Sequence, residues 1–456
     1  MSTVAASGYR AEPLKKTQSL AFIISASSGG TLIEWYDFFL YGVLAIFFAG
    51  HFFPGDMKNG FLYSLGIFWT GFVVRPLGAV IFGYLGDLIG RKYTFMLTLG
   101  LMGSSTFLVG CLPTYAEVGW LAPALLVACR MVQGLALGGQ YGGAATFIAE
   151  HAPDGERGFY TSWLQTTATM GIVAALLVIM AFRLGMGDQA FGDYGWRFPF
   201  MFSALLVILS AYLRLKLGES PLFRRLKEMG KASSSPMRDA YGNGRNWRLI
   251  LLALFGFTAP ASVVWYTSQF YVLAYMQTVL MVPYVTVYLV MITALTLSVP
   301  FFLFFGWLSD RIGRRVIMTS GFVLAVLSYW PVFRLMGEVK DSPLLLTALV
   351  GYLMVLVTIT YAPLAAFLIE LFPARIRYSC LSVPYHIGTG VFGGGVPFIA
   401  TALATTFTGI PLIGLAYPVV IVGIGVAVST LGLRQETHQV RIWDEVAEPA
   451  VSPATS

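Results

Sequence analysis

Twelve long apolar stretches run through the sequence, and their length is what most constrains the fold. A helix that crosses a bilayer needs roughly 20 mainly apolar residues, and in the hydrocarbon layer it satisfies its own backbone hydrogen bonds. Charged side chains make up 11% of the chain, against about 25% in soluble domains. We therefore expect an all-α, polytopic membrane protein. Its twelve helices are expected at about 20–49, 61–86, 93–113, 121–149, 159–182, 198–217, 248–277, 284–308, 316–336, 344–369, 379–404 and 412–433.

The distribution of Lys and Arg predicts the orientation of these helices. With twelve spans both termini lie on one side, and the segments on that side carry 22 of the 29 Lys and Arg residues. Because positively charged loops stay inside the cell, both termini are expected in the cytoplasm. A basic segment after the sixth span divides the chain. The expected parts are an N-terminal segment (1–19), a six-helix half (20–217), a cytoplasmic linker (218–247), a second six-helix half (248–434) and a cytoplasmic tail (435–456).

Two sets of residues recur between the halves, which indicates duplication. The glycine-rich charged motif around Asp87 recurs around Asp310, 223 residues later, and Glu150 recurs as Glu370, 220 residues later. Paired six-helix halves are a common transporter plan, with the substrate site between them. An aspartate at a helix N-terminus, beside glycines and basic residues, is expected to form a latch that breaks and re-forms. The expected cytoplasmic latch comprises Gly83, Asp87, Gly90, Arg91, Asp310, Gly313 and Arg314, completed by Glu150, Arg157, Glu370 and Arg377.

Two carboxylates interrupt the first apolar stretch. Glu34 and Asp37 are three positions apart, so in a helix they share a face, and Tyr41 follows one turn later. A charged acid at membrane depth costs on the order of 3 kcal/mol on insertion scales. Such acids usually face a bundle interior or a watery cavity, so we expect this pair to carry protons. A position near the membrane surface, or pairing with a structural Arg, is the alternative.

Two arginines also lie within apolar stretches. Arg75 stands in the second span before Pro76, which removes a helix hydrogen bond and bends the helix locally, and Arg130 opens the fourth span. Arg stays protonated in any surroundings, so a buried one needs an anion, which is Glu34, Asp37 or a substrate carboxylate. We expect Arg75 to contact an anionic substrate, with a structural pairing to Asp37 as the alternative. Arg130 is expected to be structural or part of a proton relay.

Together these motifs resemble those of the major facilitator superfamily, and more narrowly its metabolite:proton symporter branch. The resemblance covers nearly the whole chain. The segments that carry it, besides the two loop motifs, are Glu34–Phe38, Val74–Gly78, Arg130–Gly134, Gln133–Ala144 and Phe392–Gly394. Known members of the branch take up citrate, 2-oxoglutarate, shikimate, or proline and betaine. This sequence departs from the usual pattern at Leu88, where Arg is usual, and at Gln140, where Glu is frequent.

The resemblance implies proton-coupled uptake of a small polar metabolite, expected to be an organic acid, by alternating access. A carboxylate that faces water on one side and a drier cavity on the other gains and loses a proton as its exposure alternates. One buried Arg suits a monovalent acid better than a tricarboxylate. The residues expected to bind substrate are Arg75, Tyr41, Gln133, Trp265, Tyr266, Gln269, Tyr361 and Tyr385.

The seventh span repeats the aromatic residues of the first without its acids. Trp265 and Tyr266 stand 230 residues after Trp35 and Tyr36, so the ionisable chemistry is expected in the N-terminal half. Aromatic residues also form interfacial belts, which is the alternative for this set. For His386, a buried hydrogen-bonded position and a titrating role both stay open.

Other functions follow from the same features. A zwitterion, betaine or amino-compound symporter would use Trp265 and the tyrosines as a cation-accepting box, and an exporter would share the fold. We expect no enzyme, because no nucleophile–base pair, metal-ligand cluster or phosphate loop is found, and the three cysteines lack metal or redox spacing. We expect the proton as coupling ion and otherwise no cofactor, no metal and no nucleic-acid partner. A monomer in the lipid bilayer of the bacterial inner membrane is expected.

Overall fold

The structure is a computed structural model that describes residues 20–54, 57–89, 91–215, 241–373, 376–410, 412–432 and 436–440. Every regular element within these ranges is a helix. The N-terminal half contains α1 (Leu20–Val43), α2 (Ala45–Phe52), α3 (Met57–Val73), α4 (Arg75–Ile89), α5 (Arg91–Cys111), α6 (Tyr115–Val118), α7 (Leu121–Gly138), α8 (Tyr141–His151), α9 (Arg157–Met186), α10 (Asp188–Asp193), the 3₁₀ turn η1 (Gly195–Arg197) and α11 (Phe198–Leu215).

The C-terminal half repeats this plan with more irregular helices. It contains α14 (Gly244–Ala253), the π-helical turn η2 (Leu254–Thr258), α15 (Ala259–Tyr266), the π-helical turn η3 (Thr267–Tyr271), α16 (Val272–Thr278), α17 (Tyr284–Ile312), α18 (Arg314–Glu338), α19 (Pro343–Tyr361), α20 (Leu364–Leu371), α21 (Arg377–Ile387), the π-helical turn η4 (Gly388–Gly393), α22 (Val396–Thr406), the 3₁₀ turn η5 (Ile413–Leu415) and α23 (Ala416–Gly432).

The membrane-spanning pattern predicted from hydropathy is confirmed. Ten helices in the described ranges are long and apolar enough to cross a bilayer, and the bent pair α1 and α2 makes an eleventh. The twelfth predicted stretch is α5, whose apolar part, Met96–Cys111, is shorter. Most of the predicted linker lies outside the described residues. Where the second half was expected to begin at residue 248, α14 begins at Gly244, because the Asn243 side chain caps it by accepting a hydrogen bond from the Arg245 backbone at 2.9 Å.

Several of the predicted continuous helices are broken near their middle. The first span bends by 55° between α1 and α2. The second breaks at Val74, directly before Arg75 and Pro76, where the sequence predicts a bend. The π-helical turns interrupt the seventh and eleventh spans. Such turns recur at functional sites because they free backbone groups and redirect side chains, so these breaks draw attention to the middle of the bundle.

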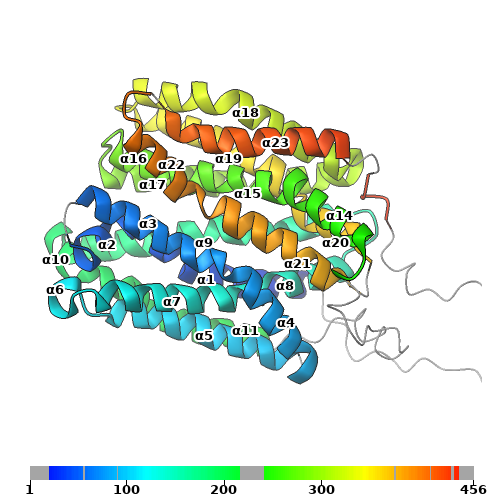
Figure 1. The fold of residues 1–456 in the computed structure, drawn as a ribbon, viewed down its shortest axis with the longest axis horizontal. Coiled ribbons are helices and arrows are strands. Elements are labelled where there is room, and N and C mark those ends of the chain that lie inside the picture. The colour runs from blue at the N-terminus through cyan, green and yellow to red at the C-terminus, as the bar shows by residue number, and fades with distance from the viewer. Residues whose placement is uncertain are drawn as a thin grey trace, which may run out of the picture.

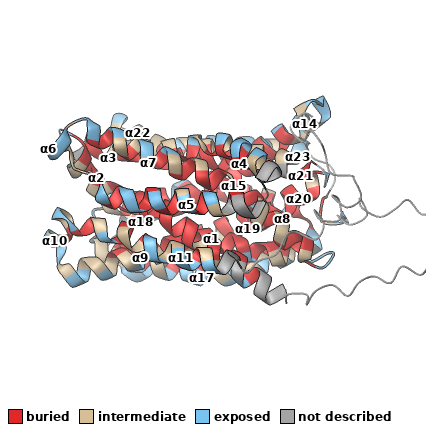
Figure 2. Ribbon diagram, turned by 90° about the horizontal axis from the view of Figure 1, so that it is seen from below, coloured by how far each residue is buried: buried red, intermediate tan, exposed pale blue. Residues whose placement is uncertain are grey.

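The two halves lie side by side, with the first in the lower part of Figure 1 and the second in the upper part. They meet along two seams: α9 packs against α17, and α3 and α4 pack against η4, α21 and α22. Buried residues concentrate along the middle of the bundle, whereas exposed residues gather on its outer surface (Figure 2). The outward side chains are largely apolar, as expected where lipid is the solvent.

Glycines in α7 allow the second span to pack closely in the first half. A Cβ atom at Gly134 would collide with the backbone carbonyl of Gly71, and one at Gly138 with that of Arg75. Gly134 and Gly138, four residues apart, therefore form a small-residue contact between helices. Gly143 lies in the same span and would have no atom within 4 Å of an added Cβ atom.

We predict that Gly134→Ala destabilises the bundle by about 1–3 kcal/mol, because the added methyl group forces α3 and α7 apart. Gly143→Ala is the matched control and should be neutral or slightly stabilising, since Ala favours helix. Thermal unfolding in detergent, followed by tryptophan fluorescence, measures both. Equal midpoints for the two variants would contradict the close contact at Gly134.

Candidate functional site

The acids of α1 are buried within the first half. Glu34 and Asp37 are each 1% exposed. Asp37 lies near Ser203 of α11 and near Glu34, without the geometry of a hydrogen bond to Ser203. The intervening Tyr36 donates a hydrogen bond to the Pro199 carbonyl at 2.8 Å. The face of α1 that bears Asp37 is therefore turned toward α11, within its own half. The expected burial inside the bundle is confirmed, while the proton-carrying role stays a prediction.

Arg75 lies where α4 begins, completely buried, in an aromatic box formed by Trp35, Phe72 and Tyr385. Its guanidinium carbon is 5.5 Å from the Trp35 ring centre, 5.7 Å from that of Phe72 and 5.9 Å from that of Tyr385. In the described part of the chain none of its three guanidinium nitrogens has a hydrogen-bond partner. The box joins the halves, because Tyr385 comes from α21.

A tyrosine cluster continues from the aromatic box. Tyr141 of α8 stacks on Tyr385 with ring centres 3.6 Å apart, and the Tyr385 hydroxyl is 3.2 Å from that of Tyr361. Tyr141 donates a hydrogen bond to Gln165 at 3.0 Å, and Gln165 donates one to the Tyr361 carbonyl at 2.9 Å. The cluster thus links α8 and α9 to α19 and α21. Tyr361 and Tyr385 therefore lie together at the interface between the halves, and their contact with substrate stays a prediction.

The sequence analysis missed Trp35, Phe72, Tyr141 and Gln165 as members of this site. Gln165 offered a signal, because it is a polar residue within the apolar stretch 159–182. Tyr141 offered none, because the sequence did not predict the break that precedes it, between α7 and α8. The two other aromatic residues stand in runs rich in rings, where only the fold shows which ones face Arg75.

The predicted aromatic residues of the seventh span lie next to the box. Trp265 and Phe39 have ring centres 5.1 Å apart, and Tyr266 meets Phe72 edge-on at 5.3 Å. Gln269, in η3, donates a hydrogen bond to Thr169 at 3.4 Å. These contacts join α15 and η3 to the first half, so the predicted residues of this span are brought together at the interface.

Arg130, Tyr41 and Gln133 form a separate network inside the first half. Arg130 donates hydrogen bonds to Gln133 at 2.7 Å and to the Phe38 carbonyl at 3.2 Å, and its guanidinium stacks 4.6 Å from the Tyr41 ring centre. Gln133 also donates to Thr106 at 2.8 Å, and Tyr41 donates to a backbone carbonyl. This engagement favours a structural role for all three, and it separates Tyr41 and Gln133 from the predicted contact with substrate.

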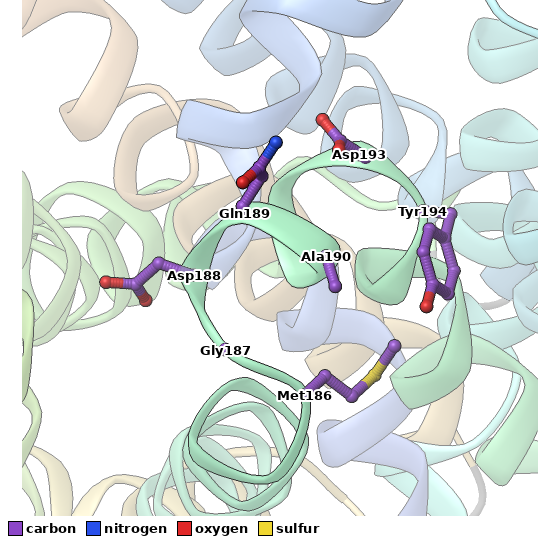
Figure 3. A pocket seen from close by; sticks show the side chains of 7 residues that line it. All are labelled: Met186, Gly187, Asp188, Gln189, Ala190, Asp193 and Tyr194. Atoms are coloured by element: carbon purple, nitrogen blue, oxygen red, sulfur yellow. The ribbon is translucent and has the colours of Figure 1, made fainter.

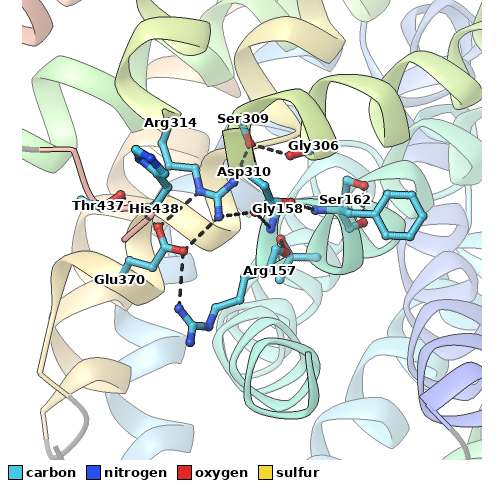
Figure 4. A network of polar contacts seen from close by, with 12 residues as sticks. Arg157, Gly158, Ser162, Gly306, Ser309, Asp310, Arg314, Glu370, Thr437 and His438 are labelled. Atoms are coloured by element: carbon cyan, nitrogen blue, oxygen red, sulfur yellow. Dashed lines mark hydrogen bonds and ion pairs between the residues drawn. The ribbon is translucent and has the colours of Figure 1, made fainter. Parts of the chain in front are cut away.

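At one end of the bundle a charged network crosses between the halves (Figure 4). Asp310 of α17 accepts hydrogen bonds from the backbone N–H groups of Gly158 and Phe159, both at 2.8 Å, and from Arg314 at 2.6 Å. Arg314 is 3.0 Å from Glu370. A carboxylate of the second half therefore caps the N-terminus of α9 in the first half, where the helix dipole favours negative charge.

We call Asp310, Arg314, Glu370 and Arg157 the Asp310 latch. Arg157 lies 3.8 Å from Glu370 and also pairs with Asp154. Close approach of α9 and α17 at this point depends on glycine, because a Cβ atom at Gly306 would meet the Gly158 carbonyl at 2.6 Å and the Ser162 side chain at 2.7 Å. The predicted residues Asp310, Arg314 and Glu370 therefore lie together, and they are joined to Arg157 of the first half instead of being completed within their own half. The opening and closing of this latch stays a prediction.

Residues 436–440 pack on the Asp310 latch from outside. Thr437 donates a hydrogen bond to Glu370 at 3.0 Å, and the Val440 carbonyl accepts one from Arg157 at 2.5 Å. The Glu436 carboxylate accepts from the Arg315 backbone at 3.3 Å beside Gly313, whose φ of 105° suits glycine. A segment of the predicted tail therefore belongs to this end of the bundle.

The corresponding latch of the first half is only partly described. Gly90 lies outside the described residues, as do the side chains of Asp87 and Arg91, so that part of the latch stays a prediction. Glu150 is buried. Arg377 donates hydrogen bonds to the carbonyls of Ile369 at 2.8 Å and Phe372 at 3.1 Å, and Gly83 is half-buried in α4.

At the opposite end of the bundle Arg183 joins the halves. Its guanidinium carbon lies 3.2 Å from the ring centre of Tyr284 in α17, and it donates a hydrogen bond to Asp188 at 2.7 Å. That hydrogen bond lowers the pKa of the Asp188 carboxyl. A shallow pocket of about 370 Å³ opens beside it. Figure 3 shows its lining: Met186, Gly187, Asp188, Gln189, Ala190, Asp193 and Tyr194. The pocket lies at the surface, on the segment that contains α10, and Arg75 does not line it. The candidate site is therefore the buried aromatic box around Arg75.

Comparisons with known proteins agree with this arrangement. Residues 22–246 match the family model described as sugar (and other) transporter. The chain is 34% identical to the alpha-ketoglutarate permease of Escherichia coli over 85% of its length and 88% of the relative. It is 34% identical to the shikimate transporter of Escherichia coli, with 84% and 87% covered. It is 31% identical to the citrate-proton symporter of Salmonella typhi, with 82% and 86% covered.

A solved structure shows the same fold. The crystal structure of D-xylose-proton symporter superposes with a TM-score of 0.67, at 18% sequence identity, over 92% of this chain and 99% of that one. At this identity the likeness concerns the fold alone. It agrees with the fold of two six-helix halves.

We predict that Asp310→Asn weakens the Asp310 latch and lets the halves separate at that end. Breaking a buried ion pair typically costs about 3–5 kcal/mol. Even if water or other groups recover part of this free energy, the population of the closed state should fall strongly. A cysteine in place of Ser162, which is fully buried beside Gly306, reports the separation by its rate of maleimide labelling in a background without the natural cysteines. Asp310→Asn should raise this rate at least tenfold.

Glu338→Gln is the matched control, because it neutralises a carboxylate whose ion pair with Arg334 is exposed, and exposed pairs contribute little. It should leave the labelling rate unchanged. An unchanged rate in Asp310→Asn as well would show that the latch does not hold the halves together.

Proposed function

We propose a function from the premise that this chain belongs to the major facilitator superfamily, within the metabolite:proton symporter branch of its curated relatives. It is a multi-pass membrane transporter that couples the uptake of a small organic acid to protons by alternating access. The acid binds at Arg75, between the halves. The family and the relatives are transporters rather than enzymes, and we extend this to the chain itself.

The observation that carries the proposal is the buried guanidinium of Arg75, which has no hydrogen-bond partner among the described residues. Arg remains charged when buried, and an unpaired buried charge is strongly unfavourable. A carboxylate fits the guanidinium fork with two parallel hydrogen bonds, the strongest arrangement for such a pair. A substrate carboxylate would therefore supply the counter-charge that the described protein groups do not.

The surroundings of Arg75 favour a small acid of low charge. The described neighbours of its guanidinium are rings of Trp35, Phe72 and Tyr385, and the next groups outward are hydroxyls of Tyr141 and Tyr361. Neutral groups of this kind hydrogen-bond a substrate without adding positive charge. Names of relatives that refer to alpha-ketoglutarate, shikimate and citrate support an organic acid as the class.

Proton coupling is assigned to Glu34 and Asp37. Both acids lie within one helical turn of Trp35, the residue that covers the Arg75 guanidinium. A substrate carboxylate at Arg75 would neutralise positive charge near α1 and favour retention of a proton there. When the halves separate at the end that carries the Asp310 latch, the latch would open. Substrate and proton would then leave together on that side.

A symporter of betaine or another zwitterion is the second candidate. The rings of Phe39, Trp265, Tyr266 and Phe270 gather beside Arg75, with centres 5.1–5.2 Å apart for the pairs of Phe39 with Trp265 and Phe270. Such rings bind quaternary ammonium groups, while Arg75 would hold the carboxylate. Uptake into proteoliposomes, screened over organic acids, betaines and amino compounds, separates the two candidates, and the same assay with reversed gradients tests export.

The remaining features of the proposal concern the surroundings of the chain. We propose that it acts as a monomer in the bacterial inner membrane, with both termini in the cytoplasm. The coupling ion is the proton, and no other cofactor or metal takes part. Under this orientation the Asp310 latch faces the cytoplasm and the contact of Arg183 with Tyr284 faces outward.

We predict that Arg75→Lys raises the KM for the transported acid by about 10–100-fold, because Lys keeps the charge but loses the bidentate fork. The estimate follows from about 1.5–3 kcal/mol for a charge-assisted hydrogen bond. Arg75→Gln should abolish saturable uptake. Arg334→Gln, at an exposed position, is the control and should transport like the unmodified protein. Unchanged KM in both Arg75 variants would exclude Arg75 as the anion contact.

We predict that Asp37→Asn abolishes accumulation of the acid against its gradient but retains exchange of labelled for unlabelled acid. With one proton per monovalent acid, a gradient of one pH unit supports roughly tenfold accumulation, since about 1.4 kcal/mol is tenfold. The variant should reach a ratio near one. Asp193→Asn, at an exposed residue of α10, is the control. Full accumulation by Asp37→Asn would refute the assignment of coupling to this acid.

A further inference from the structure

His386 is a buried polar residue that the proposed function has not used. It follows Tyr385 in α21, it is 0% exposed, and its ring meets the Tyr385 ring edge-on with centres 5.2 Å apart. Neither ring nitrogen has a hydrogen-bond partner in the described part of the chain. Backbone atoms of Gly138 lie close by, without the geometry of a hydrogen bond.

The position of His386 places it at the edge of the aromatic box. Its neighbour in the chain, Tyr385, is one wall of that box, and Arg75 is near enough for its charge to act on the imidazole. Gly138 is in turn packed against the Arg75 backbone. His386 and the Arg75 guanidinium are therefore two buried polar groups at one place, both with unused hydrogen-bonding capacity.

The local backbone fits a residue that is held for a ligand. The π-helical turn η4 begins at Gly388, two residues after His386, and turns of this type recur at functional sites. Thr389 donates a hydrogen bond to the Tyr385 carbonyl at 2.7 Å, which fixes the backbone beside the imidazole. A buried imidazole without a partner costs about 1–3 kcal/mol, and a bound ligand with a second polar group would remove that cost.

We propose that His386 is a specificity-determining residue that hydrogen-bonds a hydroxyl or oxo group of the substrate while Arg75 binds its carboxylate. The inference rests on the proposed function and names the substrate class more narrowly: a small hydroxy acid or oxo acid rather than a plain aliphatic acid. A neutral imidazole both donates and accepts hydrogen bonds, so it satisfies either group. A site with such a buried partner rejects an analogue that lacks the group, because the site's own polar atom then stays unpaired.

Matched pairs of acids test the inference. The members of each pair differ only in hydroxyl or oxo groups: by one group in lactate and propionate and in 2-oxoglutarate and glutarate, and by three hydroxyls in shikimate and cyclohex-1-ene-1-carboxylate. Their inhibition constants are measured against uptake of the best transported acid into proteoliposomes. For at least one pair the unmodified protein should prefer the hydroxy or oxo acid by tenfold or more.

Two substitutions separate recognition from folding. His386→Phe keeps a ring of similar shape without nitrogen atoms, and it should reduce the preference to less than threefold by weakening only the hydroxy or oxo acid. His386→Gln keeps a donor and an acceptor, and it should restore part of the preference. Inhibition by the plain acid, which depends on Arg75, should stay unchanged in both variants, and the melting temperature of the ligand-free protein should not fall in either of them.

The outcomes distinguish this inference from the proposed function. If acids bind through Arg75 but the preference is the same in His386→Phe, or if both members of a pair weaken equally, the inference about His386 is wrong and the proposed function stands. If no acid of the panel binds the unmodified protein, the proposed function fails and this inference fails with it.

Discussion

A permanently charged guanidinium inside an apolar bundle is the constraint on which the rest of this structure depends. Arg75 is buried where α4 begins, in rings from α1, α3 and α21. Rings offer it only weak cation–π attraction, on the order of 1–2 kcal/mol, which is less than the cost of an unpaired buried charge. The free energy of the site therefore favours an anion from outside, and because both halves build the box, the same anion draws the halves together.

Charge is handled differently at the two ends of the bundle. In the Asp310 latch every charged group has several partners. The Asp310 carboxylate of the second half accepts hydrogen bonds from backbone N–H groups of the first half. Such a contact is stable when closed, yet water satisfies all of its groups when the halves separate. At the opposite end a single Arg183 lies on a tyrosine ring beside an exposed acid. A closed state held at both ends around a central anion site is what alternating access requires.

Much of the fold was predictable from the sequence, because lipid imposes one simple rule on every span. Hydropathy predicted the twelve stretches, and the repeat around Asp87 and Asp310 predicted two related halves. The breaks after Gly138 and in η3 and η4 were harder to predict, since tertiary contacts rather than local hydrophobicity support them. The bend before Pro76 is the exception, because proline removes a hydrogen bond wherever it stands.

The candidate site was predictable in Arg75 and in two of its tyrosines, Tyr361 and Tyr385, but not in most of its rings. Arg75 stands out in an apolar stretch, whereas Trp35, Phe72 and Tyr141 resemble dozens of other rings until the fold places them. Gln133 and Tyr41 were predicted as substrate contacts because they are polar and intramembrane, but Arg130 engages both. A polar side chain in a span has two ways to be satisfied, by a protein partner or by a ligand, and the sequence alone does not distinguish them.

The most direct measurement for this account is a cryo-EM structure of the protein with a transported acid bound. The account predicts density for the acid between the halves, with a carboxylate within hydrogen-bond distance of two Arg75 nitrogens and the Trp35, Phe72 and Tyr385 rings around it. A carboxylate bound elsewhere, with the Arg75 guanidinium still touching only aromatic rings, would contradict it.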